Sequence, residues 1–329
     1  MVAPMSAVPS TRIKGVMNTF DTFYDKHWAE NPMLQQIKPC MDFIESKNDA
    51  RTETFMMLGA PPGFERWDED APRVAGSIQD QSWEVPVLKW QAGVEWKRID
   101  EEDDLTSGRF RKRLEQTAEK AVLKDVEIFF QLLQASVSAK NLPGIPTCAD
   151  GLALFSTSRV LMSPNGNVVN GSGVRTVHQF QRDFYEVLEK MQAVTDDKGD
   201  YYFNESDIMG RKIVFANPAN RQRMQEAFKA KVIASQGAGV ENILASTTDN
   251  ITMVFTPRVT GNSWYVFLEN VPAKPIFALT RKSVAGVEKI YKDESNSDRA
   301  EASDTRRIVF RYRKGYGYSL PIGAWQVSN

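Results

Sequence analysis

Hydrophobic side chains recur every three or four residues in three segments of the sequence, which predicts three amphipathic helices. The longest segment is 109–140, where no proline or glycine interrupts the pattern. At 1.5 Å per residue, such a helix is roughly 45 Å long, more than a small core requires. A second helix is predicted over residues 177–194 and a shorter one over residues 14–28.

Between residues 82 and 97 the hydrophobic period changes to two, which is typical of extended strands. Trp83 lies on the first part of this pattern, and Trp90 and Trp96 lie beyond a shift of phase. Pro86 restricts the first part to a sheet edge or a bulge, because proline has no N–H. Three tryptophans on a two-stranded projection need a surface that buries them. We expect that surface on another chain.

Strand and helix patterns alternate in the second half of the sequence. Strands are predicted at residues 211–218, 250–259, 262–270 and 274–282, and a helix at residues 220–232. Two more strands flank a glycine-rich turn in residues 306–325. The mixture predicts an α+β fold.

Composition excludes several classes of function. With 42% hydrophobic and 25% charged residues among 329, the chain is typical of a globular protein. Its 41 basic and 42 acidic residues give a net charge of −1, so bulk electrostatics does not indicate a nucleic-acid binder. Cys40 and Cys148 stand far apart, which argues against a disulfide framework or a zinc pattern and fits a reducing cytosol. The sequence carries no signal-peptide or membrane-span pattern.

Motifs of catalysis are equally scarce. The only histidines, His27 and His178, both lie in helical patterns, so histidine chemistry is disfavoured. The segment GAGVEN (237–242) lacks the lysine and further glycine of a phosphate-binding loop. From motifs alone we expect no enzyme, no catalytic residue, no metal and no cofactor.

An acidic stretch, Asp100 to Asp104, directly precedes the longest predicted helix. Carboxylates there are stabilised by the positive end of the helix dipole, which is the simplest interpretation. A second is ion pairing of Asp103 and Asp104 with a neighbouring subunit. A metal or catalytic site is a third, but adjacent side chains point in different directions.

Basic residues follow this acidic stretch within the segment RFRKR (109–113). Phosphate groups of DNA are one potential partner for them, and an ordinary solvated helix face is the competing interpretation. The four basic side chains of the segment are Arg109, Arg111, Lys112 and Arg113.

Five segments, taken in order, resemble a known family. They are MLGAPPGFERW (57–67), WQAGVEWKRIDEEDD (90–104), DGLALFSTS (150–158), SWYVFLENVPAKPIFALTRK (263–282) and YRKGYGYSLPIGAWQ (312–326). Together they resemble the major capsid protein of tailed bacteriophages, with the Hong Kong 97-type fold, and more narrowly the Mu-like major head subunit family. One departure is that Arg159 and Val160 replace the histidine-proline that usually follows the Ser/Thr pair.

The resemblance implies an architecture. An N-terminal arm is expected first, followed by an extended loop, a peripheral domain that contains a long spine helix, an axial domain and returning strands of the peripheral domain. The corresponding residue ranges are 1–62, 63–100, 101–149, 150–304 and 305–329.

The resemblance also implies a function. The chain is expected to assemble with itself into pentamers and hexamers of an icosahedral shell around non-specifically bound double-stranded DNA. Portal, scaffold and decoration proteins are expected partners, whereas a membrane and a small-molecule substrate are not. Assembly in the cytoplasm of a bacterial host and a final location in the virion capsid are expected. Trp83, Trp90 and Trp96 are expected to anchor the extended loop on a neighbour.

Two alternatives stay open at this stage. One is an encapsulin-like nanocompartment, which shares the fold but encloses enzymes. The other is a metal-dependent hydrolase that uses the carboxylates of residues 100–104.

Overall fold

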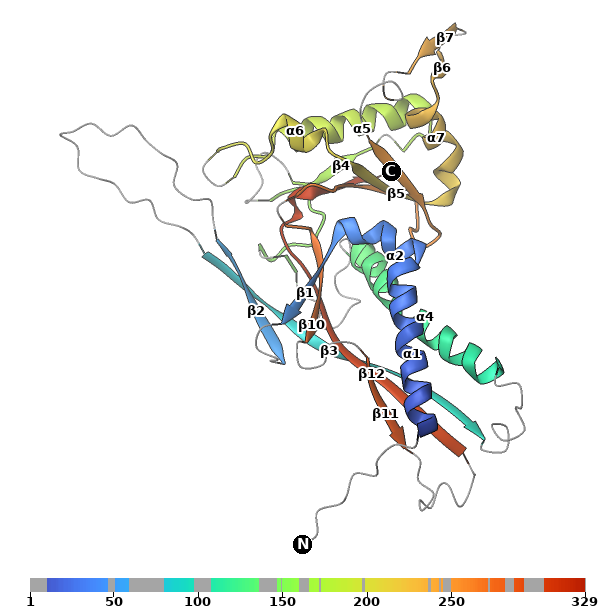
Figure 1. The fold of residues 1–329 in the computed structure, drawn as a ribbon. Helices are drawn as coiled ribbons and strands as arrows, with labels where there is room; N and C mark the ends of the chain where they lie inside the picture. The colour runs from blue at the N-terminus through green and yellow to red at the C-terminus, as the bar shows by residue number, and fades with distance from the viewer. Residues whose placement is uncertain are drawn as a thin grey trace, which may run out of the picture.

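A computed structural model describes most of the chain (Figure 1). The described residues are 11–46, 51–58, 80–97, 108–135, 147–148, 150–159, 166–171, 173–196, 199–235, 238–242, 244, 250–271, 273–281, 287–292 and 305–328. Two main sheets lie one above the other in the view of Figure 1, and the long helix α4 reaches from one to the other.

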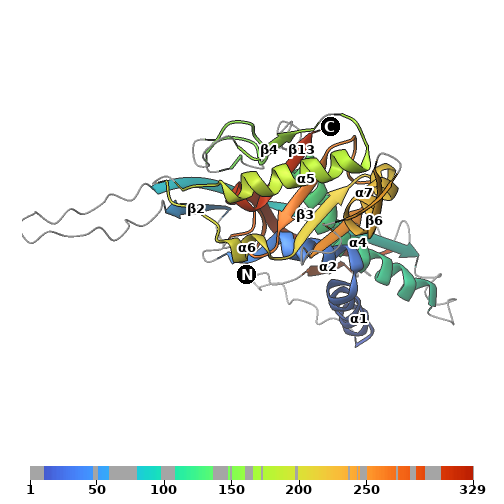
Figure 2. The same cartoon turned by 90° about the horizontal axis from the view of Figure 1, so that it is seen from above.

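The helices fall into two groups. α1 (Thr11–Glu30), α2 (Pro32–Ile37) and α4 (Gly108–Ala135) pack together beside the first sheet. α5 (Val177–Gln192), α6 (Glu205–Ile208) and α7 (Arg221–Lys229) cover the second sheet, as Figure 2 shows from above. Short 3₁₀ turns occur at η1 (Lys38–Cys40), η3 (Pro218–Asn220) and η5 (Pro321–Gly323).

The first sheet has six strands in the order β1-β10-β12-β3-β2, with β11 also paired to β12. β3 and β12 are its longest strands and run antiparallel over eleven residue pairs, from Val87 opposite Gly315 to Lys97 opposite Thr305. The strands are β1 (Met41–Ser46), β2 (Thr52–Leu58), β3 (Asp80–Lys97), β10 (Ile276–Arg281), β11 (Glu288–Lys292) and β12 (Thr305–Tyr318).

The second sheet has five strands in the order β4-β13-β9-β5-β8. Its central strands, β5 and β9, are buried along their whole length, because α5 and α7 cover one face and α4 covers the other. The strands are β4 (Val168–Asn170), β5 (Lys212–Ala216), β8 (Ile251–Phe255), β9 (Trp264–Leu268) and β13 (Ala324–Ser328). A separate hairpin pairs β6 (Val232–Ser235) with β7 (Ala238–Glu241).

Local sequence explains where several helices begin. Asn31 caps α2, because its side-chain oxygen accepts the backbone N–H groups of Met33 and Leu34, and Pro32 occupies the first helical position. Thr176 caps α5 by accepting the N–H of Gln179. The helices predicted over residues 14–28, 177–194 and 220–232 correspond to α1, α5 and α7.

The long helix α4 takes part in two hydrophobic clusters. Its first half packs with α1 and β12, where Leu114 and Ala118 meet Phe20 and Phe310. Its second half lies between the two sheets, where Phe129 contacts Phe215 and Phe267 of the second sheet. The length of this helix, which exceeds what a small core requires, is therefore explained by its contacts within the chain.

The sheets group the chain differently from the contiguous residue ranges expected for the subdomains. β10 and β11 fall in the range 150–304 but pair with β12, and β13 falls in the range 305–329 but pairs with β9. Residues 87–97 of β3, which fall in the expected extended loop, are part of the first sheet. A strand's own period-two pattern does not identify its hydrogen-bonding neighbour. The subdomain boundaries stay a prediction.

Candidate assembly site at the long helix and the extended strands

The segment YRKGYGY of β12 places two kinds of side chain on its two faces. Because strand residues alternate in direction, Lys314, Tyr316 and Tyr318 face α4, whereas Gly315 and Gly317 face away. The tyrosines and the glycines of this segment, which contributed to the family resemblance, therefore lie on opposite faces of β12.

The face toward α4 forms a buried polar cluster around Asp125. Lys314 Nζ donates to Asp125 Oδ2 at 2.6 Å, and the Tyr316 hydroxyl donates to Asp125 Oδ1 at 2.6 Å. Two helical turns further, Tyr318 donates to the carbonyl of Leu132 at 2.9 Å. Burial lowers the pKa of Lys314 more than any other single cause, but Asp125 and Tyr24 together outweigh it through charge and hydrogen bonds, and the net pKa is raised. The Lys314 ammonium is therefore charged at neutral pH, and its hydrogen bond to Asp125 holds helix to sheet.

Aromatic rings enclose this ion pair. The Lys314 ammonium lies 5.0 Å from the ring centre of Trp28, the position from which a cation is attracted to an aromatic face. Trp90 donates its indole N–H to the carbonyl of Lys314 at 3.3 Å, and Lys124 lies 5.1 Å from the Trp90 ring. Trp90 is thus held by β12 and α4 of its own chain.

The opposite face of β12 is where β3 crosses it. A Cβ atom on Gly317 would lie 2.9 Å from Phe277 Cζ and 3.2 Å from Val85 Cγ2, and one on Gly315 would lie 3.0 Å from the carbonyl oxygen of Pro86. The first distance is shorter than real Cβ contacts and the other two are tighter than most of them, so a side chain at either glycine would force its neighbours to shift. The two glycines let the first part of β3 pass over the sheet. There Phe55 of β2, the strand paired with this part of β3, packs on Phe277 with the two ring centres 4.7 Å apart.

The three predicted anchor tryptophans all have partners in their own chain. Trp96 is 8% exposed and packs with Phe20 and Leu114. Trp83 is half-buried and stacks on Phe55 at 5.9 Å. The premise that these tryptophans lack a burial surface within the chain is wrong, because β12, α1 and α4 cover Trp90 and Trp96, and β2 covers Trp83. Their contact with a neighbouring subunit stays a prediction.

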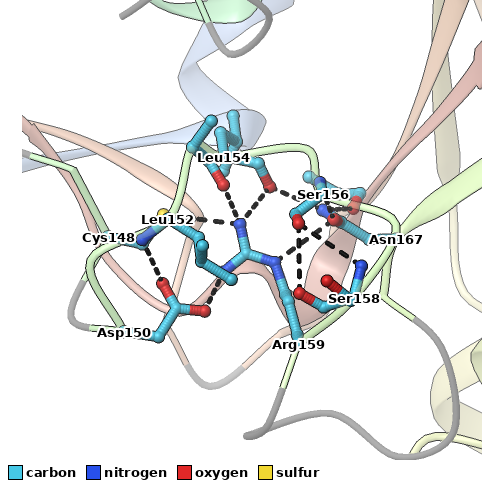
Figure 3. Close-up of polar contacts among 10 residues, drawn as sticks. Cys148, Asp150, Leu152, Leu154, Ser156, Ser158, Arg159 and Asn167 are labelled. Carbon is cyan, nitrogen blue, oxygen red and sulfur yellow. Dashed lines mark hydrogen bonds and ion pairs between the residues drawn. The ribbon is translucent and has the colours of Figure 1, made fainter.

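A second buried polar cluster surrounds Arg159 (Figure 3). Its guanidinium pairs with Asp150 at 2.5 Å, and both side chains are nearly inaccessible to solvent. It also donates to the carbonyls of Ala153 and Leu154, to the latter at 2.8 Å. Cys148 Sγ lies 3.8 Å from the same guanidinium. The planar, five-donor group of arginine suits this divergent set of acceptors.

Asn167 connects the Arg159 cluster to the end of the chain. Its Oδ1 accepts the N–H of Ser156 at 3.0 Å, and its Nδ2 donates to the carbonyls of Leu154 and Ala324 at 2.7 and 2.9 Å. The preceding Gly166 has a φ of 75°, and a Cβ atom there would lie 2.1 Å from the Ser156 carbonyl oxygen. The cluster therefore fastens the segment around residues 148–159 to β13.

The remaining predicted site residues form no site in the described part of the chain. Asp103 and Asp104 lie outside the described residues, with the rest of the acidic stretch. Arg109 and Arg111 belong to the first turn of α4, and Lys112 and Arg113 are exposed on it. Among the described residues, no three metal-ligating side chains gather, and no helix combines the length and apolar character of a membrane span.

The sequence interpretation missed Asp125, Lys314 and Arg159 as structurally important residues. A signal existed for the first two. Asp125 lies in helical phase with the buried Val122 and Phe129, and Lys314 shares the strand face of Tyr316. A charged residue at an apolar phase position indicates a buried partner.

A comparison with protein families shows to which family this chain belongs. The family described as "Mu-like prophage major head subunit gpT" matches residues 13–196, more than half of the chain. The chain belongs to this family. The resemblance inferred from the five segments is therefore confirmed.

A curated relative agrees with this assignment. The Mu-like prophage FluMu major head subunit of Haemophilus influenzae is 29% identical over 143 residues, which cover 44% of this chain. The matched stretch spans 42% of that relative's own length.

Solved structures show that the fold is shared more widely. The procapsid of bacteriophage JBD30 matches 98% of this chain and 76% of that chain, with a TM-score of 0.52 and 16% identity. A virus-like particle from Pyrococcus furiosus matches 96% of this chain and 98% of that chain, with a TM-score of 0.50 and 9% identity. The α+β fold matches Hong Kong 97-type capsid proteins, which confirms the predicted fold class at this coarse level.

Proposed function

We propose that many copies of this chain assemble, as pentamers and hexamers, into a closed icosahedral shell that encloses double-stranded DNA. Membership of the major head subunit family carries this proposal, and the fold shared with a procapsid protein supports it. A closed shell needs heterologous contacts that form rings together with a curvature that closes the surface. The near-neutral net charge of −1 suits the close packing of many copies.

Negative-stain electron microscopy of the protein expressed alone in bacteria tests the proposal. We expect round particles of uniform size. Soluble monomers that never form particles, even with the other head proteins of the same phage, would contradict a shell function.

An encapsulin-like compartment is the alternative within the same fold. Nuclease-resistant DNA in particles purified from an infection supports a phage head. Particles filled with an enzyme and free of nucleic acid support the compartment. A hydrolase has no support from a head-subunit family, and chelator-sensitive turnover by monomers would be needed to revive it.

Among the three tryptophans, we propose Trp83 as the one that contacts a neighbouring subunit. It is half-buried, whereas Trp96 is 8% exposed in its own core and Trp90 is held by Lys314 and Lys124 of its own chain. Trp83→Ala should reduce the particle yield and leave subunit stability little changed. Trp96→Ala, the matched control, should lower subunit stability by about 3–5 kcal/mol. Normal particles from Trp83→Ala argue against the contact.

For DNA, we propose non-specific electrostatic contact through Arg109, Arg111, Lys112 and Arg113 at the start of α4. Lys112 and Arg113 are exposed, as such contact requires. Replacing both by Gln should lower the amount of DNA packaged while empty shells still form. Full packaging by this variant refutes the contact.

Two further expectations belong to this proposal. Asp103 and Asp104 are proposed to pair with basic groups of a neighbour, so that Asp103→Asn with Asp104→Asn weakens shells against dissociation by salt. Portal, scaffold and decoration proteins are proposed partners, and the virion capsid is the location that family membership gives. Co-purification of assembled heads with their phage proteins tests the partners.

A further inference from the structure

One side of β3 has no neighbouring strand along part of its length, within the portion of the chain that the structure describes. β3 pairs with β12 over residues 87–97, but β2 covers its other side only over residues 80–86. β3 therefore continues past the end of β2 with one side open. Residues 88–94, which we call the β3 edge, span about 23 Å at 3.3 Å per residue.

The direction of the backbone groups on the β3 edge follows from one hydrogen bond. The N–H of Val87 donates to the carbonyl of Arg51 at 3.0 Å, on the β2 side of the strand. The register between β3 and β12 is unbroken. Because backbone groups alternate in direction along a strand, the N–H groups of Lys89, Gln91 and Gly93 point to the open side. Those of Leu88, Trp90 and Ala92 point to β12.

Pro86 agrees with this assignment. It belongs to the set of residues whose N–H would point to the β12 side, and the ladder with β12 ends one residue away, at Val87. A proline at this position therefore removes no hydrogen bond of the sheet. By the same reasoning, a proline at a residue whose N–H points to the open side removes that N–H and keeps the hydrogen bonds with β12.

Side chains leave the open side of the β3 edge accessible. Lys89, Gln91 and Gly93 are exposed, and Ala92 is exposed on the other face. Only Lys89 carries the kind of charge with which proteins guard an edge strand. An edge of this length with small or uncharged residues at its centre is a template for a further strand.

We propose that the β3 edge is completed in the assembled shell by an extended segment from a second copy of this chain. This inference rests on the proposed function, since a head subunit meets many copies of itself. β1, at the opposite end of the same sheet, also pairs on one side only among the described strands. Two unlike open edges allow head-to-tail contacts, which generate rings. A few backbone hydrogen bonds per contact suffice, because each subunit is held at several contacts at once.

A proline substitution tests the inference at one atom. Gln91→Pro removes an N–H that points to the open side and leaves the ladder with β12 intact. We expect a folded subunit with an almost unchanged melting temperature and about a tenfold lower yield of shells. Gln91→Ala, which keeps the N–H, should form shells normally. Ala92→Pro removes an N–H that points to β12 and should unfold at a lower temperature.

Hydrogen–deuterium exchange on the unaltered protein provides a second measurement, which does not depend on a variant that folds. The amides of Lys89, Gln91 and Gly93 should exchange quickly in free subunits and slowly in shells made of this chain alone. The amides of Leu88, Trp90 and Ala92 should exchange slowly in both. If these amides exchange slowly only when another head protein is added, that protein, and not a second copy of this chain, covers the β3 edge. Such a result would overturn the inference.

The outcomes separate this inference from the proposed function. Normal shells from Gln91→Pro, or fast exchange of the three amides in shells, overturn the inference and leave the shell function intact. If the unaltered chain forms no shells with its phage partners present, both fail.

Discussion

Lys314 of β12 and Asp125 of α4 form a buried ion pair whose Nζ and Oδ2 atoms are 2.6 Å apart. The two residues are separated by 189 positions in the sequence. The Tyr316 hydroxyl donates a hydrogen bond to the other carboxylate oxygen, Asp125 Oδ1. This single relationship fixes which turn of the long helix lies on which part of the sheet, because a shift of either element would leave a buried charge without a partner.

Removing one member of the pair should destabilise the subunit strongly. Asp125→Leu leaves the Lys314 ammonium buried and uncompensated, and we expect a loss of about 3–5 kcal/mol in the free energy of unfolding. Urea denaturation of unassembled subunits measures it. Asp125→Leu combined with Lys314→Met should recover part of the loss, because no charge is then left unpaired.

A surface pair provides the control for this experiment. Lys190 and Glu186 on α5 are 3.0 Å apart, but each side chain is about one-third exposed. Lys190→Met should change stability by less than about 1 kcal/mol. If Asp125→Leu is no more damaging than Lys190→Met, the buried pair has no fastening role.

The crossing of β3 over β12 depends on Gly317. Gly317→Ala places a Cβ atom 2.9 Å from Phe277 Cζ, and we expect a loss of about 1–3 kcal/mol from overpacking. Phe277→Leu in the same chain should relieve part of that loss. Gly93→Ala is the matched control, because its Cβ would meet the Arg307 side chain at an ordinary 3.5 Å. Equal thermal stability of the Gly317→Ala and Gly93→Ala variants would contradict the packing assigned to the crossing.

Arg159 should not be replaceable by lysine. The single nitrogen of a lysine ammonium cannot reach the acceptors that three guanidinium nitrogens serve, which are Asn167, Asp150 and the carbonyls of Ala153 and Leu154. Each group left unsatisfied costs about 1–3 kcal/mol. We expect Arg159→Lys to lower the urea midpoint and to speed proteolysis between residues 148 and 159. Arg182→Lys, at an exposed position on α5, should leave both unchanged. An unaltered midpoint for Arg159→Lys shows that charge alone suffices there.

Stability should fall at alkaline pH. Burial raises the pKa of the Cys148 thiol to about 12, and burial raises the pKa of Cys40 further still. An unfolded thiol titrates near about 8.5, so above that pH the unfolded chain loses protons that the folded chain keeps. The contribution of the two buried, protonated thiols to stability is therefore fully present below about pH 8.5 and is lost as the pH rises toward 12.

Urea midpoints measured from pH 7.5 to 10.5 check this expectation. The double variant Cys40→Ala with Cys148→Ala should have a flatter dependence above about pH 8.5, where the thiols act. The buried Tyr265, whose pKa burial raises to about 12, contributes a further decline above about pH 10 in both proteins. Identical slopes for the two proteins between pH 8.5 and 10 would rule out the thiols as the cause.

Local patterns in the sequence suffice for the type and position of most elements. The apolar period of α5 and the capping residue Thr176 act within a few residues of one another, so local pattern suffices to place that helix. The alternation in residues 82–97 predicted extended structure correctly but as a two-stranded projection, whereas residues 80–97 form the single strand β3. The order of five motifs indicated the head-subunit family, which the family comparison confirmed.

Which distant elements meet is known from the three-dimensional fold and not from local patterns. The partner of Trp96 is β12 with α1, the partner of Asp125 is Lys314, and β10 and β13 join sheets on opposite sides of the expected boundaries. Strand pairing and buried ion pairs depend on complementary groups brought together by the chain as a whole, and period-two or period-3.6 patterns carry no information about which partner is chosen. For that reason the tryptophans were assigned to a neighbouring subunit, although their own chain buries Trp96 and contacts the other two.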